Sequence, residues 1–137
     1  MSIENKFPGK DVSTSDLLDK FPLVAKKSQS HYSCFSICGI EFGSDLIPVF
    51  AGPNMIETEE LIHNIASSVK KSGAHFLRGG AFKPLSFPYR SEKYNETRQQ
   101  GLQWMYEAGI AFNIPIITEI MDQKLVEHIS KYTDIIQ

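Results

Sequence analysis

The stretch LIPVFAGPNMIETEELIHNIASSVKKSGAHFLR, residues 46–78, decides the fold because it holds a complete strand–helix–strand unit. Residues 46–52 are a continuous apolar run ending at a glycine, which predicts a strand buried on both faces. Residues 57–73 place apolar side chains at helical spacing, with Thr58 as the predicted N-cap and Gly73 as the residue after the last turn. Residues 74–78 predict a second short strand. Two strands joined by a helix in this way predict a parallel pair with a right-handed crossover.

The alternation of strands and helices continues after this unit. A long loop is predicted from residue 79 to about residue 95. The elements predicted beyond it alternate in type: a helix over 96–113, a strand over 114–120, a helix over 122–132 and a strand from 133. Residues 34–42 alternate between apolar and polar side chains, which predicts a short hairpin with Gly39 at its turn. The whole order predicts an α/β fold with a parallel sheet. A dinucleotide-binding sheet is disfavoured because no GxGxxG follows the first strand.

The composition is that of a single globular domain. The chain has 137 residues, of which 42% are hydrophobic and 22% are charged. A net charge of −2 disfavours a general nucleic-acid binder, and no apolar run reaches the roughly 18 residues needed to span a membrane. The polar N-terminus is neither a signal peptide nor a transit peptide, so we expect a cytoplasmic protein. Residues 1–33 are predicted to be a polar, loosely ordered extension, and residues 34–137 the folded domain.

Two cysteines, Cys34 and Cys38, lie four residues apart. The alternation of residues 34–42 predicts that both point to the same face of a strand. A zinc site would need a second Cys or His pair at zinc-site spacing, which the sequence does not contain. We therefore expect two reduced thiols rather than half of a metal site.

Polar side chains follow every predicted strand of the parallel sheet. Asn54 comes after the first strand, Arg78 ends the second, Glu119 follows the third and Gln137 follows the last. The C-terminal ends of parallel strands open on one common face, so we expect these side chains to meet. One polar residue at a strand end is more often a helix cap or part of a salt bridge. Four successive strands that all end this way favour a functional site.

Arg78 and Lys83 are the pair that points to a ligand. They flank Gly79 and Gly80, whose lack of a side chain lets backbone amides approach a bound molecule. A guanidinium and an ammonium together suit a ligand with a carboxylate or a phosphate. The structural alternative is an ion pair between Arg78 and Glu119 on the neighbouring strand. Both hypotheses can hold together, because an arginine that binds a ligand is often held by a carboxylate.

Five segments together resemble one enzyme family: FAGPNMIE, GAHFLRGGAFKP, SFPY, PIITEIMD and YTDIIQ. They are similar to the 3-deoxy-D-arabino-heptulosonate 7-phosphate synthases, whose motifs read AGPCS-E, LRGGA-KPRTSPY, TE and ADIIQIGARN. The related 3-deoxy-manno-octulosonate 8-phosphate synthases share the same barrel. The resemblance covers roughly residues 35–137 and implies a (β/α)8 TIM barrel. We expect this chain to be a fragment covering only about the first four strands, after a short N-terminal hairpin.

The resemblance also implies an activity and its residues. Family members are transferases that condense phosphoenolpyruvate with an aldose phosphate, here erythrose 4-phosphate, in the shikimate pathway of aromatic amino-acid biosynthesis. Many form dimers or tetramers, so a homo-oligomer is expected. The motifs assign Lys83 and Glu119 as catalytic residues. They assign as substrate-binding residues Arg78, Lys83, Pro84, Ser86 and Asn54.

The sequence departs from the family motifs at the expected metal and aldose sites. Asn54 stands where the family has a metal-binding cysteine, and a neutral amide is a weak ligand for a divalent cation, so no metal cofactor is predicted. Leu85 stands where the family has the arginine that would bind the aldose phosphate, and Phe87 adds apolar bulk. The IGARN segment of the family, with the further phosphate-binding and metal-binding residues beyond it, does not occur in the sequence.

Three hypotheses about function therefore stay open. The chain is part of a synthase that uses erythrose 4-phosphate, or part of a synthase that uses a different aldose. Alternatively, it is a catalytically inactive, truncated paralogue that acts as a binding or oligomer partner. In both synthase hypotheses phosphoenolpyruvate is the ligand that the Arg78–Lys83 pair is expected to recognise, whereas the inactive paralogue would bind a barrel protein or a small anion without turnover.

Overall fold

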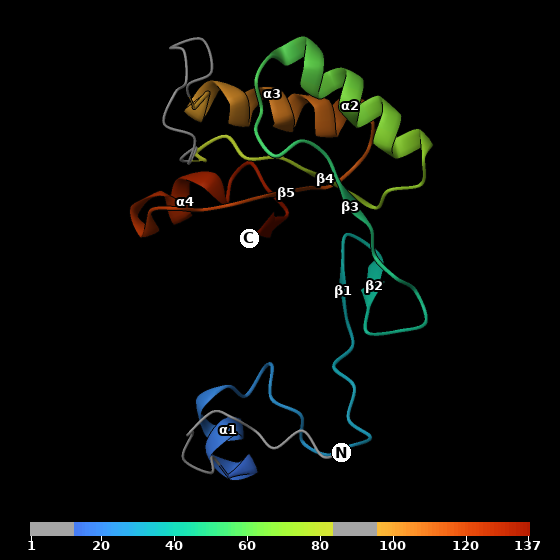
Figure 1. Cartoon of the computed structure of the whole chain (residues 1–137), viewed down its shortest axis with the longest axis vertical. Helices are drawn as coiled ribbons and strands as arrows, with labels where there is room; N and C mark the ends of the chain where they lie inside the picture. The colour runs from blue at the N-terminus through green and yellow to red at the C-terminus, as the bar shows by residue number, and fades with distance from the viewer. Residues whose placement is uncertain (1–12, 84–95) are drawn as a thin grey trace, which may run out of the picture.

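The computed structural model of the chain describes residues 13–83 and 96–137 (Figure 1). The helices are α1 (Thr14–Lys20), α2 (Glu59–Lys71), α3 (Arg98–Ala111) and α4 (Val126–Ile129), the last preceded by the 3-10 turn η2 (Gln123–Leu125). The strands are β1 (Phe35–Ile37), β2 (Ile40–Phe42), β3 (Phe50–Ala51), β4 (Phe76–Arg78), β5 (Ile116–Thr118) and β6 (Ile135–Ile136). Within these described ranges, no helix is both long enough and apolar enough to cross a membrane.

The main sheet has the predicted parallel arrangement. Its four strands lie in the order β3-β4-β5-β6, and each neighbouring pair is parallel. Helices α2 and α3 connect successive strands and lie side by side against one face of the sheet (Figure 1). The prediction of an α/β fold with alternating strands and helices is therefore confirmed.

The core lies between the sheet and these two helices. It is formed by apolar side chains that are fully or almost fully buried: Ile62 and Ala66 of α2, Leu77 of β4, Leu102, Met105 and Ala108 of α3, and Ile116 of β5. Each buried side chain of the size of leucine or methionine contributes about 1.5–3 kcal/mol relative to leaving it exposed. The buried side chains of α3 are the ones that face the sheet.

The ends of α2 follow the sequence prediction. The hydroxyl of Thr58 accepts a hydrogen bond from the backbone N–H of Leu61 at 3.2 Å, as an N-cap does. Gly73, just past the last turn, has a φ of +86°, which a glycine adopts without a steric penalty. The helix between them starts at Glu59 and ends at Lys71, with acidic side chains in its first turn and basic ones in its last, as the helix dipole favours.

The prediction of a doubly buried strand over residues 46–52 is wrong. Strand β3 contains only Phe50 and Ala51, and Ile47 is 81% exposed. The physical reason is position: β3 lies at one end of the strand order and pairs with β4 alone. Continuous apolar sequence is typical of parallel strands covered on both faces, but it does not show whether the described chain supplies both covers.

The short hairpin is confirmed, but the placement of its cysteines is not. Strands β1 and β2 pair antiparallel, with Ile37 opposite Ile40. The two residues between them, Cys38 and Gly39, have φ values of +51° and +77°, which is the backbone of a tight two-residue turn. Cys38 therefore belongs to the turn and Cys34 precedes β1, so the two thiols do not share a strand face. Both are free thiols.

Aromatic rings join the hairpin to the main sheet. The rings of Phe35 and Phe42 stack with centroids 4.8 Å apart, and Phe42 lies 5.8 Å from Phe76 of β4. Phe76 also stacks on Phe50 at 4.8 Å and is completely buried. Successive side chains of a strand point to opposite faces. Because Leu77 belongs to the core on the helix side, Phe76 anchors the hairpin on the other face.

The third predicted helix, over residues 122–132, is much shorter than expected. The segment begins with the 3-10 turn η2 and continues as four residues of α4. The carboxylate of Asp122 accepts a hydrogen bond from the backbone N–H of Lys124 at 2.9 Å, which favours the tight first turn. Only Ile129 of α4 is fully buried, so little apolar packing is available to extend the helix.

Candidate active site

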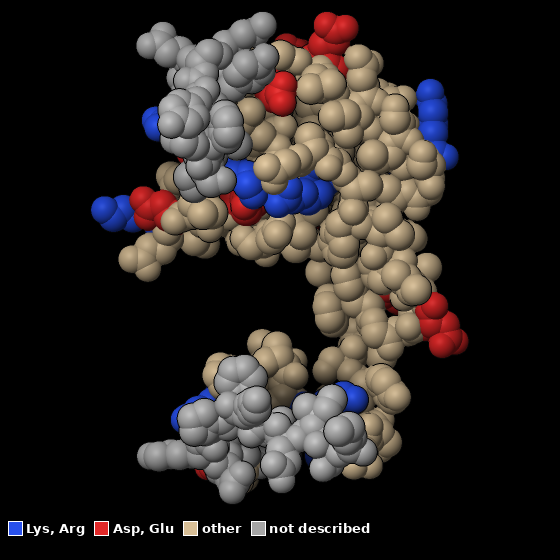
Figure 2. Space-filling model, in the orientation of Figure 1, with Lys and Arg blue, Asp and Glu red and all other residues tan. Residues whose placement is uncertain are grey.

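The C-terminal ends of the four parallel strands bring together the polar residues predicted to meet there. Arg78 is the last residue of β4, Glu119 follows β5, and Gln137 follows β6. Asn54 lies in the connection that leaves β3. Figure 2 shows basic atoms in contact with acidic atoms on the upper body of the molecule, among side chains that carry no charge. The expected convergence at one edge of the sheet is confirmed.

Arg78 is held on all three of its side-chain nitrogens. Its Nε donates to Oε1 of Gln137 at 3.3 Å. Its Nη1 lies 3.4 Å from the carbonyl oxygens of Pro53 and Asn54 and from Oδ1 of Asn54. Its Nη2 lies 3.3 Å from Oε1 of Glu119. A guanidinium has a fixed planar fork of donors, so acceptors placed around it fix its orientation.

Lys83 and Arg78 share Glu119 as their counter-ion. The Lys83 ammonium donates to both carboxylate oxygens of Glu119, at 3.0 and 3.1 Å. The ion pair between Arg78 and Glu119, which the sequence offered as the structural alternative, is therefore present, and Lys83 joins it. The side chains of Arg78 and Lys83 are 22% and 24% exposed, whereas Glu119 is 12% exposed. The cations can thus be reached from solvent, and the carboxylate lies behind them.

Two glycines allow this close arrangement. A Cβ on Gly80 would lie 2.6 Å from Oε1 of Glu119, so only a glycine leaves space for the carboxylate beside the backbone. A Cβ on Gly52 would lie 1.9 Å from the carbonyl oxygen of Arg78, so the chain leaving β3 could not pass β4 so closely with any larger residue. The buried hydroxyl of Thr118 donates to the carbonyl of Gly79 at 2.7 Å and fixes the loop that follows Arg78.

The residues that form the site differ in part from those predicted from the sequence. Gln137 was among the polar strand ends but not among the predicted site residues, although its amide oxygen is a direct partner of Arg78. Its position at the end of the fourth strand was the available signal. Pro84 and Ser86, predicted to bind substrate, lie outside the described residues, as do Leu85 and Phe87.

The donors that the described residues place around Asn54 do not suit a divalent metal ion. Among the residues that the structure describes, no group of three or more His, Cys, Asp or Glu side chains gathers at one place. The amide oxygen of Asn54, at the position of the family's metal-binding cysteine, lies within hydrogen-bonding distance of Arg78. A neutral amide beside a guanidinium is a poor site for a cation. We therefore derive no chemical step through a metal.

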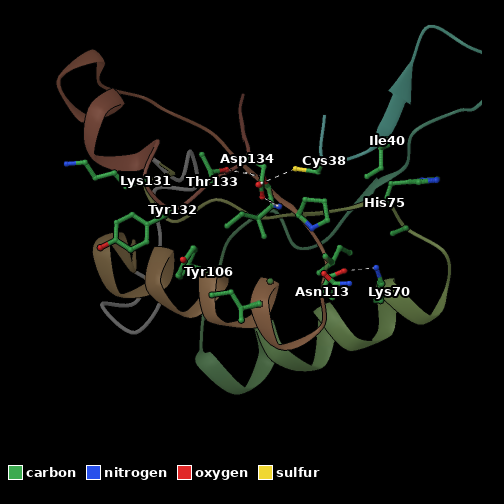
Figure 3. A pocket seen from close by; sticks show the side chains of 16 residues that line it. Cys38, Ile40, Lys70, His75, Tyr106, Asn113, Lys131, Tyr132, Thr133 and Asp134 are labelled. Atoms are coloured by element: carbon green, nitrogen blue, oxygen red, sulfur yellow. Dashed lines mark hydrogen bonds between the residues drawn. The ribbon is translucent and has the colours of Figure 1, made fainter. Parts of the chain in front are cut away.

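A second polar cluster lies at the opposite end of the strands (Figure 3). Asp134 precedes β6, and its carboxylate accepts from the backbone N–H of Ile116 at 2.8 Å and from Sγ of Cys38 at 3.4 Å. It thus ties the hairpin turn to the sheet, beside a cavity of about 610 Å³. Burial raises the pKa of the Cys38 thiol, and the hydrogen bond to Asp134 and its negative charge raise it further.

Replacing Asp134 with asparagine should make Cys38 more reactive. A raised pKa lowers the thiolate fraction at any given pH, and the thiolate is the form that reacts. Removing the carboxylate charge lowers the pKa, so iodoacetamide should modify Cys38 about threefold faster at pH 8. The pH midpoint of alkylation, followed by peptide mass spectrometry, should move downward. Cys34 in the same chain serves as the internal reference, and an unchanged midpoint would contradict the role given to Asp134.

Comparison with known proteins gives a family for this chain. The model of the DAHP synthetase I family matches residues 20–137. Among curated proteins, the chain is 26% identical over 137 residues to a phospho-2-dehydro-3-deoxyheptonate aldolase of Thermotoga maritima, covering 98% of this chain and 40% of the relative. It is 33% identical over 98 residues to a 2-dehydro-3-deoxyphosphooctonate aldolase of Pisum sativum, covering 65% of this chain and 32% of the relative.

The fold comparison agrees with the sequence comparison. The crystal structure of a Thermotoga maritima phospho-2-dehydro-3-deoxyheptonate aldolase matches with a TM-score of 0.68 and 25% identity, over 78% of this chain and 30% of that one. A truncated form of 3-deoxy-D-arabino-heptulosonate 7-phosphate synthase from the same organism matches with a TM-score of 0.64, at 23% identity. The chain spans well under half of the length of the curated relatives it matches.

Proposed function

Since this chain belongs to the DAHP synthetase I family, we propose that it supplies the phosphoenolpyruvate-binding part of an enzyme that condenses phosphoenolpyruvate with an aldose phosphate. The observation that carries the proposal is the convergence of Arg78 and Lys83 on one carboxylate at the C-terminal edge of a parallel sheet. Phosphoenolpyruvate carries a carboxylate and a phosphate, and a rigid guanidinium beside an ammonium suits both groups.

The proposal includes the architecture of the whole enzyme. The four parallel strands are the first four of a (β/α)8 barrel, with residues 1–33 as an extension and residues 34–137 as the barrel part. The strand order and the likeness to a Thermotoga maritima aldolase support this assignment. In such barrels the chemistry takes place at the C-terminal ends of the strands, which is the edge where Arg78 and Lys83 lie.

The reaction makes one carbon–carbon bond and releases phosphate. Carbon 3 of the enol attacks the aldehyde carbon of the aldose phosphate, and the aldehyde oxygen takes up a proton. Water adds at carbon 2, and the carbon–oxygen bond to phosphate breaks to leave a ketone. Of the two protons of the water, one balances the proton taken up by the aldehyde oxygen and the other leaves on the released hydrogen phosphate. Lys83 and Arg78 hold the negative charges of phosphoenolpyruvate while carbon 2 becomes electron-poor. Glu119 makes an ion pair with both cations, and Asn54, with Pro84 and Ser86, completes the proposed substrate site.

The second substrate is proposed to be erythrose 4-phosphate, in the first step of aromatic amino-acid biosynthesis. Leu85, in place of the family's arginine, makes a different aldose the main competing choice. The homo-oligomer and the cytoplasmic location expected from the sequence stay predictions.

Binding and turnover separate these hypotheses. The chain should bind phosphoenolpyruvate in a calorimetric titration, in the presence of EDTA. Loss of phosphoenolpyruvate absorbance and release of phosphate should then be followed with erythrose 4-phosphate, arabinose 5-phosphate and ribose 5-phosphate in turn. The turnover assays need a chain as long as the curated relatives, because this chain covers 40% of one and 32% of the other. In that longer chain, turnover with another aldose alone would identify a different second substrate, and binding without turnover would favour the inactive paralogue. Absence of binding would overturn the proposal.

A further inference from the structure

Glu119 occupies the hydrogen-bond donors that an incoming anion needs. Its Oε1 receives hydrogen bonds from both Arg78 and Lys83, and its Oε2 receives a second one from Lys83. The carboxylate lies against Gly80, where a Cβ would come within 2.6 Å of Oε1. This is the glycine loop that the sequence assigns to the ligand. Glu119 takes two of the three ammonium hydrogens of Lys83, so a carboxylate or phosphate that makes more than one hydrogen bond to Lys83 must take donors over from Glu119.

The two cations depend on Glu119 to different degrees. Arg78 also has hydrogen-bond acceptors on Pro53, Asn54 and Gln137, so its orientation survives without the carboxylate. The described residues provide Lys83 with hydrogen-bond acceptors on Glu119 alone. Arg78 therefore keeps other acceptors when Glu119 is removed, whereas Lys83 loses both of the hydrogen bonds that the described residues give it.

The charge of the cluster leads to the same conclusion. Two cations and one carboxylate leave a single net positive charge, whereas phosphoenolpyruvate and the phosphate dianion each bring two or more negative charges. Among the described residues, no further acidic side chain makes an ion pair with either cation. Within residues 13–83 and 96–137, Glu119 thus halves the positive charge offered to the ligand, and its side chain is only 12% exposed and weakly screened by solvent.

We propose that Glu119 is an internal competitor of the anionic substrate: its carboxylate engages Lys83 and thereby weakens anion binding at the Arg78–Lys83 pair. The inference rests on the proposed function, because it concerns the same anion site. It assigns Glu119 a role opposite to that of a support. A support strengthens binding, so its removal lowers affinity, whereas removal of a competitor raises affinity.

The test is the replacement Glu119→Gln, which keeps the shape of the side chain. The amide oxygen still accepts from Arg78, the negative charge is lost, and the amide nitrogen can donate to an anion. Calorimetric titrations with phosphoenolpyruvate and with inorganic phosphate should show binding at least about tenfold tighter than in the wild-type chain. Glu127→Gln is the matched control, because Glu127 is 92% exposed and makes its ion pair with Lys131, at 3.8 Å, and not with Arg78 or Lys83. It changes the net charge equally and should leave both affinities unaltered.

A second variant protects the test against a folding defect in the first. Glu119→Asp keeps the charge but withdraws the carboxylate from Lys83 by one methylene. It should bind phosphate with an affinity between those of the wild type and Glu119→Gln. Far-UV circular dichroism of each variant establishes that it is folded before its affinity is compared.

The possible outcomes separate this inference from the proposed function. If Glu119→Gln binds phosphoenolpyruvate no better than the wild type, or worse, the competitor role is wrong and phosphoenolpyruvate binding stands. If the wild type fails to bind phosphoenolpyruvate but Glu119→Gln binds phosphate more tightly than the wild type does, the competitor role stands and the substrate assignment falls. If neither chain binds either anion, both proposals are overturned.

Discussion

Replacing Lys83 with alanine should reduce phosphoenolpyruvate affinity by at least about 100-fold, because loss of one charge-assisted partner at an anion costs about 3 kcal/mol or more. The change removes the ammonium that donates to both oxygens of Glu119. It also takes the cluster of Arg78, Lys83 and Glu119 from one net positive charge to none, so the remaining carboxylate opposes the ligand without compensation. Isothermal titration calorimetry measures the effect directly.

Lys124→Ala provides the comparison for this experiment. Lys124 is an exposed lysine in η2, and its replacement alters the net charge of the chain by the same amount. The affinity of the Lys124→Ala variant for phosphoenolpyruvate should match that of the wild type. Equal affinities for wild type and Lys83→Ala would refute the assignment of Lys83 to the anion site, whatever the outcome for Glu119.

Replacing Gly52 with alanine should destabilise the chain by about 3 kcal/mol or more, since neither backbone can move away cheaply. The new Cβ would lie 1.9 Å from the carbonyl oxygen of Arg78 and 2.9 Å from its carbonyl carbon, and the φ of +151° is also unfavourable for alanine. The clash separates β3 from β4 at the residue that carries the guanidinium. Urea unfolding followed by circular dichroism should show the loss as a lower midpoint.

Gly73→Ala is the matched substitution for this measurement. Gly73 also has a positive φ, of +86°, but a Cβ there meets nothing within 4 Å. It should cost only about 1 kcal/mol, the usual penalty for alanine in the left-handed region. If Gly52→Ala and Gly73→Ala have the same urea midpoint, the close approach of the two backbones at Gly52 does not contribute to stability. The loss in both variants would then come from the positive φ alone.

Much of the fold could be predicted from the spacing of apolar residues and from the residues that cap helices. Thr58 marks the start of α2 because its hydroxyl caps the first turn, and Gly73 marks the end because glycine tolerates a positive φ. Both effects are local, so the residue types alone predict them. Burial of β3 could not be predicted in the same way. Whether Phe50 is covered depends on which chains or segments lie beyond the edge of the sheet, and a run of apolar letters carries no information about that.

The candidate site could be predicted in outline for a topological reason. Parallel strands bring their C-terminal ends to one edge, so Arg78, Asn54 and Glu119 were expected together before any contact was known. The detailed division of partners could not be predicted. That Glu119 accepts from Lys83 through both oxygens, while Gln137 takes Nε of Arg78, depends on distances of a few tenths of an ångström. Residue types and spacing do not determine such distances.

The arrangement around Arg78 has a consequence for the evolution and engineering of this chain. One guanidinium contacts segments that leave β3, β5 and β6, so three separate stretches must arrive at the same point. Adding or deleting a single residue within β5 or β6 would turn Glu119 or Gln137 away from Arg78, because successive side chains of a strand point to opposite faces. The connections at the other end of the strands are short, with residues 72–75 between α2 and β4 and residues 112–115 between α3 and β5. The chain between β4 and α3 leaves from the edge that carries Arg78 and spans residues 79–97, so libraries that vary loop length at this edge belong beyond Lys83, away from the contacts of Arg78.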